Sequence, residues 1–378
     1  MTGGAPPSTQ LATSYVERFA EPIGYVDFAR FGPPSRDVTR CLSDAAVELG
    51  EGADAVDRLA ARAVGARRLA ATLTGRGDEG AVVLTPNTSA GLFQIAFALG
   101  GGEVLVSPRE FPANVYPWLQ AARRGGAGVR WLDTPDGRVT PAAVAGTLDA
   151  RTTALAVSAV DFRTGHRADL AGLRGVLGDR LLIVDAIQGF GAADMPWALA
   201  DAVVTGGQKW LRAGWGSGFI SFSPRALARL EGSLSGWAGA SEPDRFDGRV
   251  RAPDGSAARF CMTNPDLCAA AALERGLHLV SQASIAAIAG AIAARVEAML
   301  GVVARHGGRL LAPLTSADLA GVVSFVVPDR QPQAVGAALR SCGLVVTARA
   351  DHVRLSPHAT TSFEAIERLD AGLRRVVK

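Results

Sequence analysis

The sequence predicts an α/β protein with a large domain built on a mostly parallel sheet and a smaller C-terminal α+β domain. Between about residues 80 and 225, short apolar runs such as AVVLTP, GEVLVSP and LLIVDA alternate with segments of helical spacing. Strands that are apolar throughout indicate a sheet buried on both faces, as parallel strands joined by helices form. Later in the chain, alanine-rich helices are followed by short strand-like pieces and a last helix, which predicts the smaller domain.

The length of 378 residues is large for one hydrophobic core, so we expect more than one domain. We place an N-terminal arm at residues 1–24, the large domain at 25–262 and the smaller domain at 263–378. Within the large domain, residues 229–262 are rich in Gly, Ser, Asp and Pro. This composition predicts a long loop at an active site or at a subunit interface.

The composition excludes several classes of protein. The net charge is only +3 and the arginines are scattered, so we expect no binding to nucleic acid or to a membrane surface. The N-terminus lacks a basic segment followed by an apolar run, and no stretch offers about 18 uninterrupted apolar residues. The four cysteines have neither disulfide nor zinc-site spacing. We therefore expect a cytoplasmic protein without a metal.

Two charged residues follow apolar runs at expected strand ends. Asp185 ends LLIVD, and Lys209 follows ADAVVTGG. Singly, Asp185 is as often a helix cap, and Lys209 is more often a surface lysine in a glycine-rich turn. Together they have the arrangement that holds a pyridine ring, because the carboxylate keeps the ring nitrogen protonated and the lysine forms a Schiff base with the aldehyde carbon.

A candidate phosphate site comes earlier in the chain. The segment NTSAG, residues 87–91, follows the run AVVLTP and opens a helical segment. Hydroxyl groups and free N–H groups at a helix N-terminus bind anions without a basic residue, although an ordinary Ser/Thr cap has the same sequence.

These motifs together resemble the class V branch of the fold-type-I pyridoxal phosphate (PLP) enzymes, which includes cysteine desulfurases, kynureninase and isopenicillin N epimerase-like proteins. The resemblance extends over roughly residues 20–375, and its most specific part is VDAIQG followed by GGQKWLRAGWGSG. It implies that PLP is the cofactor, that Lys209 is the Schiff-base lysine and that Asp185 is the partner of the pyridinium nitrogen. It also places Gln188 opposite the phenolic oxygen of the cofactor.

The resemblance assigns further cofactor contacts. Phe111, in SPREFPANVYPW, takes the place of an aromatic residue or histidine stacked on the cofactor ring; a core phenylalanine is the alternative. Thr88 and Ser89 correspond to phosphate ligands, and Gln208 takes the place of a histidine that contacts phosphate in desulfurases. Thr263, in CMTNPD, resembles a residue lent by the neighbouring subunit. The family therefore implies a homodimer with shared active sites.

The resemblance also suggests substrate-binding residues. Arg354, in HVRLSPH, corresponds to the arginine that binds an amino-acid carboxylate in a bidentate fork, with a structural salt bridge as the alternative. Arg349, in TARADH, falls on the loop that closes over the site. Asp161 and Arg163 replace an asparagine-containing turn, and they form either a substrate-facing pair or a structural ion pair.

Two histidines, His166 and His358, are expected near the site mouth, where each is either an additional acid or base or a surface residue.

The segment corresponding to the cysteine-bearing loop of desulfurases, residues 346–352, contains no cysteine. Persulfide-forming desulfurase activity is therefore disfavoured. The first hypothesis is a lyase that acts at Cα of an amino acid. It eliminates a β- or γ-substituent by cleaving a C–S or related bond. The alternatives are a class V aminotransferase and an epimerase. A non-catalytic relative of the fold and a cofactor-free binding protein are further hypotheses, against which the intact Lys209, Asp185 and Arg354 argue.

Overall fold

A seven-stranded sheet, in the order β1-β7-β6-β5-β4-β2-β3, forms the centre of the computed structural model, which describes residues 11–377. All neighbouring strands are parallel except the two pairs that β7 makes with β1 and β6. The predicted mostly parallel sheet is therefore confirmed. Its strands are Val82–Leu84 (β1), Glu103–Val106 (β2), Gly128–Trp131 (β3), Thr152–Ser158 (β4), Leu181–Asp185 (β5), Ala202–Gly206 (β6) and Gly218–Phe222 (β7).

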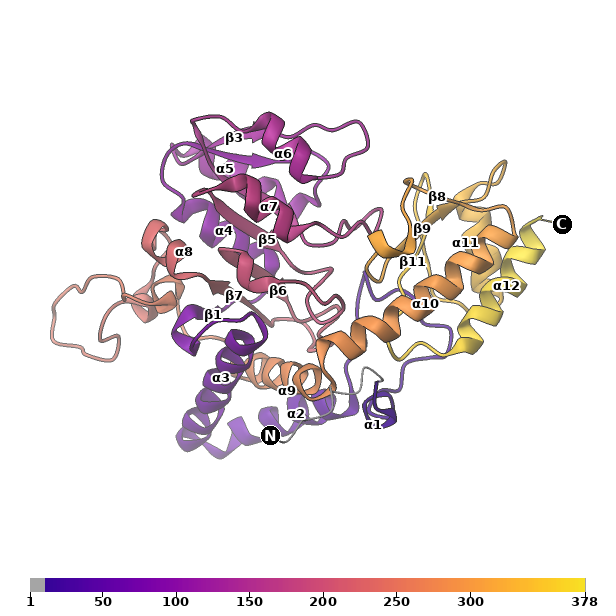
Figure 1. The fold of residues 1–378 in the computed structure, drawn as a ribbon. Coiled ribbons are helices and arrows are strands. Elements are labelled where there is room, and N and C mark those ends of the chain that lie inside the picture. Colours follow the sequence, from indigo (N-terminus) through magenta and orange to yellow (C-terminus); the bar gives the residue numbers. More distant parts are fainter. Residues whose placement is uncertain (1–10, 378) are drawn as a thin grey trace, which may run out of the picture.

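The central strands are apolar because helices cover both faces of the sheet (Figure 1). Every residue of β5, β6 and β7 is buried. Along β5, Leu182 and Val184 belong to one core cluster, whereas Leu181 and Ile183 belong to another. Helices α3 and α7 contact the sheet on the first side, and α4, α5 and α8 contact it on the second. Alternate side chains of one strand thus fill two separate cores.

The helices of the large unit and of its N-terminal segment are Thr13–Val16 (α1), Arg36–Glu48 (α2), Ala53–Leu73 (α3), Thr88–Ala98 (α4), Tyr116–Arg123 (α5), Pro141–Thr147 (α6), Leu170–Leu177 (α7), Pro224–Arg229 (α8) and Leu267–Ala283 (α9). Short 3-10 helices lie at Leu49–Glu51 (η1), Glu79–Ala81 (η2), Pro112–Asn114 (η3), Trp197–Leu199 (η4), Trp237–Gly239 (η5), Ala257–Phe260 (η6) and Ser316–Asp318 (η7).

A smaller antiparallel sheet, in the order β10-β11-β9-β8, forms the second unit. Its strands are Arg309–Leu310 (β8), Val323–Val326 (β9), Thr347–Ala348 (β10) and Val353–Leu355 (β11). Helices Ile285–Arg305 (α10), Pro332–Ser341 (α11) and Phe363–Val377 (α12) belong to this unit, in which α12 contacts both α10 and α11. Figure 1 shows α10 leading from the large unit into the smaller one.

The predicted domain boundaries differ from the observed units in two places. Helix α9 packs on α2 and α3 of the large unit, so the chain leaves that unit at α10 rather than at residue 263. Tyr25 and Asp27 form bridges to Val345 and Ser356, so the segment that follows the predicted arm runs beside β11 of the smaller unit. Both contacts join residues far apart in the sequence, which local patterns do not reveal. Residues 1–10 of the predicted arm lie outside the described residues.

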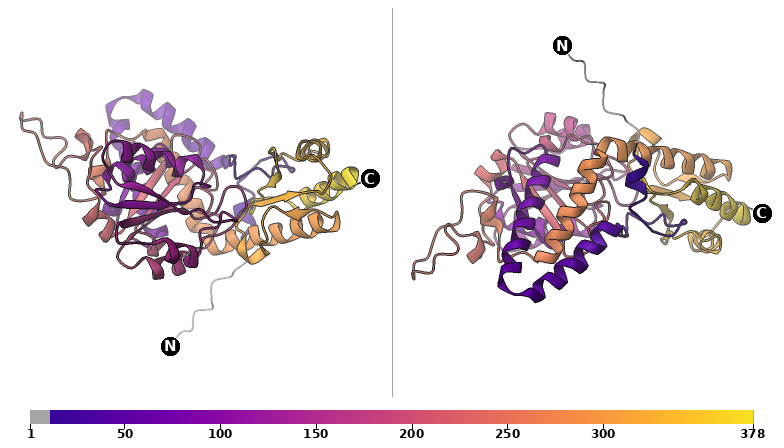
Figure 2. Two further views of the ribbon diagram at one scale, coloured as in Figure 1. Left: turned by 90° about the horizontal axis from the view of Figure 1, so that it is seen from above. Right: turned by 90° about the horizontal axis from the view of Figure 1, so that it is seen from below.

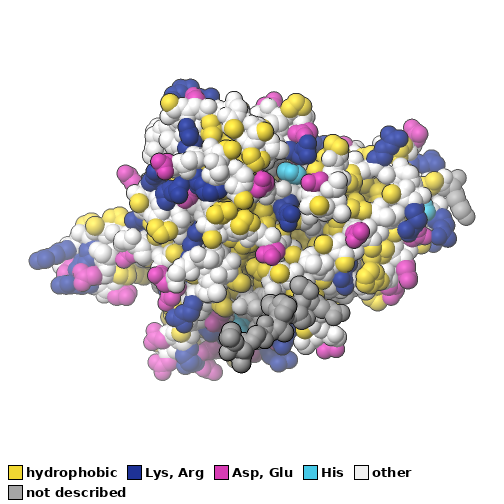
Figure 3. Space-filling model, viewed as in Figure 1, with side chains coloured by type: hydrophobic (Ala, Val, Ile, Leu, Met, Phe, Trp, Pro, Cys, Tyr) yellow, Lys and Arg dark blue, Asp and Glu magenta, His cyan; other side chains and the backbone are white. Residues whose placement is uncertain are grey.

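The long loop after α8 contains only η5 and η6 within residues 230–262, all of which the structure describes. Figure 2 shows it projecting away from the body in both views. Its most exposed apolar side chains are Phe246 and Val250. On the face drawn in Figure 3, basic and acidic side chains are interspersed and form no extended patch of one charge.

Among the described helices, α10 alone is long and apolar enough to cross a membrane by length and composition. Arg295 and Glu297 interrupt the apolar run of this helix in the sequence. In the structure Ile288, Ile292 and Val296 of this helix are buried in the main core cluster.

Candidate active site

Asp185 and Lys209 meet at the carboxyl edge of the large sheet. Strands β5 and β6 are parallel neighbours with Asp185 opposite Val204, so the segments that follow them leave the sheet at the same edge. The Lys209 segment is packed tightly there, because a Cβ atom added to Gly32 would lie 1.9 Å from the Lys209 carbonyl oxygen. The Gly32 N–H also donates to the Gln208 carbonyl at 2.9 Å. These contacts hold the lysine-bearing segment against the N-terminal part of the chain.

Burial shifts the pKa values of Asp185 and Lys209 so that each group favours its neutral form. Burial raises the pKa of Asp185 to about 6 and lowers the pKa of Lys209 to about 8. The attraction between the two groups acts against both shifts, and the Arg354 guanidinium lowers the pKa of Lys209 further. Lys209 is therefore a more available nucleophile and proton acceptor near neutral pH than an exposed lysine.

Buried polar atoms without partners test whether PLP fits these residues. Asp185 is 1% exposed, and its Oδ1 accepts from Ile187 N at 3.0 Å. Its Oδ2 has no hydrogen-bond partner among the described residues, and neither has the buried Thr88 Oγ1. Because buried polar atoms are normally hydrogen-bonded, these atoms indicate a ligand with a ring N–H and an anionic group. The residues present therefore fit PLP.

Helix α4 begins at the same edge of the sheet. Gly206, at the end of β6, pairs with Gly218, and Leu84, at the end of β1, pairs with Phe219. Asn87 caps α4 by accepting from Ala90 N at 2.9 Å. The first N–H groups of a helix have no partner within it, so the backbone of Thr88 and of the exposed Ser89 is available to a phosphate.

Phe111 lies close to Lys209. The lysine Nζ is 5.8 Å from the centroid of the Phe111 ring, and Phe162 packs edge-on against that ring at 5.1 Å between centroids. Phe111 is 42% exposed, so it is not the core phenylalanine that was the alternative. Its ring face is available to stack on a flat ligand.

Arg354 lies on β11 and is 4% exposed. Its Nη1 donates to the Phe162 carbonyl at 3.0 Å, and Nη2 is 3.5 Å from Asp27 Oδ1. Thr347 Oγ1 donates to both Asp27 oxygens at 2.9 Å. Arg354 Nε has no partner among the described residues. The arginine is thus held in place from two sides, and Nε and further N–H groups remain for a substrate carboxylate.

Gln188 and Gln208, the two glutamines predicted to contact the cofactor, differ in how firmly their side chains are held. Gln188 is 3% exposed, its Nε2 donates to the Ala29 carbonyl at 2.9 Å and its Oε1 accepts from Trp210 Nε1 at 3.0 Å. Only its second N–H is left for the phenolic oxygen of the cofactor. Gln208 is partly exposed and directly precedes Lys209, and its side chain has no hydrogen bond within residues 11–377.

Thr263 lies on the surface, along an open groove of about 570 Å³. Ala90 of α4 and Thr85 line the same groove. Thr263 therefore lies near the start of the candidate phosphate helix at a surface that a second chain can reach, and its predicted assignment to the partner's site stays a prediction.

The side chains of Asp161 and Arg163 do not form an ion pair with each other, and their predicted role in substrate binding stays a prediction. Asp161 Oδ1 accepts from the backbone N–H and the hydroxyl of Thr164, both at 2.6 Å, so this carboxylate caps its own turn. The Arg163 side chain instead forms an ion pair with Asp351 of the smaller unit. Arg349 is exposed in the turn between β10 and β11, and its side chain forms no hydrogen bond or ion pair with the described residues. It remains available to a substrate.

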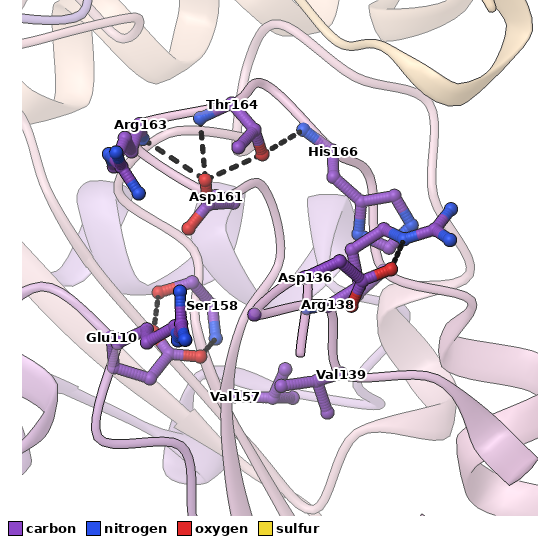
Figure 4. Close-up of a pocket in the computed structure, with 13 residues that line it drawn as sticks. Glu110, Asp136, Arg138, Val139, Val157, Ser158, Asp161, Arg163, Thr164 and His166 are labelled. Atoms are coloured by element: carbon purple, nitrogen blue, oxygen red, sulfur yellow. Dashed lines mark hydrogen bonds and ion pairs between the residues drawn. The ribbon is translucent and has the colours of Figure 1, made fainter. Parts of the chain in front are cut away.

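The expected position of His358 near the site mouth is wrong. This histidine is fully buried, with its ring 5.0 Å from the Phe28 ring, and burial together with Arg212 holds its pKa well below the ordinary value. It belongs to a core contact between the N-terminal segment and the smaller unit. His166 lines a small pocket at the edge of β4, and burial lowers its pKa (Figure 4).

Two residues of the site were not anticipated. Asp27 holds Arg354, and Glu110 holds the end of β4 next to Asp185. The signal for each was a single carboxylate directly beside a phenylalanine, in YVDFARF for Asp27 and in REFPANV for Glu110.

Comparison with known proteins decides the family. The sequence model described as Aminotransferase class-V matches residues 45–368. The protein belongs to this family. Class V aminotransferase-family proteins are PLP-dependent, so this chain is a PLP enzyme of the lyase or aminotransferase type, as the sequence predicted.

Individual relatives of this class V enzyme are distant. It is 28% identical to isopenicillin N epimerase of Streptomyces clavuligerus over 340 residues, which cover 82% of this chain and 83% of that protein. A kynureninase of Burkholderia pseudomallei is 30% identical over 295 residues, 72% of this chain and 69% of the other. A kynureninase of Deinococcus radiodurans is 29% identical over 195 residues, and this alignment spans only 47% of that relative.

Solved structures share the fold of this class V enzyme. A cysteine desulfurase of Thermococcus onnurineus superposes with a TM-score of 0.82 at 19% identity, covering 100% of this chain and 99% of the other. The cystine C–S lyase C-DES, in complex with cysteine persulfide, superposes with a TM-score of 0.83 at 21% identity, covering 94% and 97%.

The shifted pKa of Lys209 predicts selective labelling. In the folded apoprotein, an amine-acylating reagent reaches half its maximal rate at Lys209 near pH 8, because the pKa lies at about 8. An ordinary lysine has a midpoint of about 10.4. Asp185→Asn removes a charge that raises this pKa, so the midpoint falls further. Mass spectrometry separates Lys209 from Lys378, the only other lysine.

Urea-unfolded protein provides the control for this labelling, with an expected Lys209 midpoint of about 10.4. A midpoint that is the same in the folded and unfolded protein contradicts the desolvated environment described for Lys209.

Proposed function

We propose that the protein is a PLP-dependent lyase that removes the Cα proton of an amino acid and expels a β- or γ-substituent by cleaving a C–S or related bond. The observation that carries the proposal is the juxtaposition of Lys209, with its pKa lowered to about 8, and the unpartnered carboxylate oxygen of Asp185. One proton carrier is enough for such an elimination, since it can take the proton from Cα and give it to the leaving group.

Each residue has a distinct part in this scheme. Bound PLP supplies the electron sink that makes the Cα substituents labile. Arg354 binds the substrate carboxylate, and its contacts to Phe162 and Asp27 fix its orientation. Asp185 holds the proton on the ring nitrogen, Thr88 and Ser89 bind the phosphate, and Lys209 moves the proton at Cα.

The arrangement disfavours two related activities. Racemising or epimerising Cα requires a second proton carrier besides Lys209, and the Phe111 and Phe162 rings that lie near Lys209 cannot carry a proton. Persulfide formation requires a nucleophilic cysteine at the turn after β10, where Arg349 to His352 contain none. Cys342 instead directly follows the last residue of α11.

Transamination is the second candidate. It uses the same Lys209, because one lysine can move a proton from Cα to the cofactor carbon that joins the amine. The two activities differ in whether an acceptor keto acid is needed.

We also propose a homodimer with shared active sites, in which Thr263 of one subunit completes the phosphate site of the other. The groove shared by Thr263, Thr85 and Ala90 supports this arrangement, because it is open to the surface beside the start of α4.

A product assay distinguishes these reactions. With purified holoenzyme and a panel of amino acids bearing β- or γ-leaving groups, we expect ammonia and a keto acid in equal amounts without an added keto acid. Lys209→Ala lowers kcat at least about 1,000-fold because it removes the proton carrier. Lys378→Ala is the matched control and retains full activity. Turnover that depends on a keto acid, or inversion at Cα without ammonia, contradicts the lyase assignment.

Mixing two inactive variants tests the shared site. Lys209→Ala lacks the proton carrier, and Thr263→Glu places a carboxylate where we expect the phosphate. If Thr263 acts across the dimer, refolding the two together restores about a quarter of the wild-type sites, because half of the dimers are mixed and each carries one intact site. If Thr263 serves its own chain, or the protein is a monomer in sedimentation, mixing restores no activity.

A further inference from the structure

Glu110 connects the segment that carries Phe111 to the strand end beside Asp185. It directly precedes Phe111, and its carboxyl group reaches the end of β4 (Figure 4). Ser158 N donates to Glu110 Oε1 at 2.9 Å, and the Ser158 hydroxyl bonds to Oε2. Ser158 is the last residue of β4 and pairs in register with Asp185. The Glu110 side chain therefore connects the segment of Phe111 to strand β4, the neighbour of the strand that ends at Asp185.

Glu110 has no cationic partner among the described residues, although three arginines line the same small pocket. Each of these arginines is paired with another acid: Arg109 with Asp133 at 3.8 Å, Arg138 with Asp136 at 2.6 Å, and Arg163 with Asp351. The remaining titratable groups of the pocket, Asp161 and His166, belong to the turn after β4. Asp161 bonds to Thr164, and burial lowers the pKa of His166.

The carboxyl group of Glu110 thus has only neutral hydrogen-bond partners and a like charge nearby. Removal from water raises its pKa to about 7, and Asp185 contributes in the same direction. A protonated carboxyl group satisfies the geometry fully, since Oε1 accepts from Ser158 N while the Oε2 hydroxyl donates to Ser158 Oγ.

We propose that Glu110 is a positioning residue of the cofactor pocket, which holds Phe111 in place through Ser158 and carries a proton while doing so. The part of this proposal that concerns the cofactor rests on the proposed function. The protonated state adds no second negative charge beside Asp185, so Asp185 alone faces the ring nitrogen.

The amide of glutamine distinguishes the two parts of the proposal. Glu110→Gln keeps an acceptor and a donor where the protonated carboxyl group has them, and it cannot ionise. Glu110→Ala removes both bonds. If Glu110 positions Phe111, only Glu110→Ala damages the cofactor pocket. If Glu110 carries a proton, the difference in Tm between wild type and Glu110→Gln depends on pH.

The first experiment measures Tm of the apoprotein against pH and needs no cofactor. The folded-state pKa of about 7 lies above the ordinary value, so the stabilising contribution of the bound proton is complete at low pH and is lost as pH rises through 7. We therefore expect the Tm of Glu110→Gln to rise relative to wild type between about pH 5 and about pH 8.

The exposed Glu367 on α12 provides the matched control, because Glu367→Gln removes the same charge from a solvated position. Its Tm difference from wild type stays constant over this range. A constant difference for Glu110→Gln as well overturns the protonated state.

The second experiment titrates PLP into each apoprotein and follows the visible absorption of the bound cofactor. Glu110→Ala weakens PLP binding about tenfold and alters the absorption band, because two hydrogen bonds that place Phe111 are lost. Glu110→Gln stays within about threefold of wild type. Ser158→Ala removes the hydroxyl bond and keeps the backbone N–H bond, so in that background Glu110→Ala has a smaller further effect than in wild type.

The outcomes separate the two proposals. Unchanged PLP binding by Glu110→Ala, or equal damage from Glu110→Gln and Glu110→Ala, overturns the positioning role. If wild type itself binds no PLP, the proposed function fails, while the apoprotein Tm series still tests the proton on Glu110.

Discussion

The meeting of Asp185 and Lys209 at one edge of the sheet is the constraint on which the rest of the site depends. Parallel strands β5 and β6 end together, so a carboxylate and an ammonium group are withdrawn from water side by side. Each would favour its neutral form there, and each is held toward its charged form by the other. The proposed roles of Asp185 as ring partner and of Lys209 as nucleophile depend on this balance rather than on either residue alone.

The site also depends on contacts between the two units. Arg354 comes from the smaller sheet, while Asp27, which holds it, comes from the N-terminal segment. The same segment is tied to the lysine loop by Gly32 and by a buried ion pair between Glu21 and Arg212, whose side chains are 8% and 2% exposed. A buried pair of this kind is costly to break, because either partner alone leaves an uncompensated charge. The N-terminal segment therefore contacts both Arg354 and the loop that bears Lys209.

Much of this arrangement was predictable from sequence, because parallel strands have a local signature. Apolar runs located β5 and β6, and the rule that ligands bind at carboxyl strand ends selected Asp185 and Lys209. The start of α4 followed from its cap residues, and Asn87 does cap that helix. These features depend on residues that are close together in the chain.

The failures concern contacts between distant segments. Asp27 and Arg354 are brought together by a bridge between the N-terminal segment and the strand end at Ser356. Arg163 pairs with Asp351 rather than with Asp161, two residues away. His358 looked like a polar residue near the site mouth, but the aromatic rings that bury it come from Tyr15, Phe28 and Trp210. None of these partners is visible in a local pattern.

Chemical trapping of the cofactor tests the central claim most directly. PLP is added to the apoprotein, borohydride reduction makes the bond between the lysine and the cofactor aldehyde permanent, and the modified peptide is identified by mass spectrometry. The account predicts one pyridoxyl group per chain, on Lys209, and reduced occupancy in Asp185→Asn because the ring nitrogen loses its partner. Modification of Lys378 alone, or of neither lysine, would contradict it.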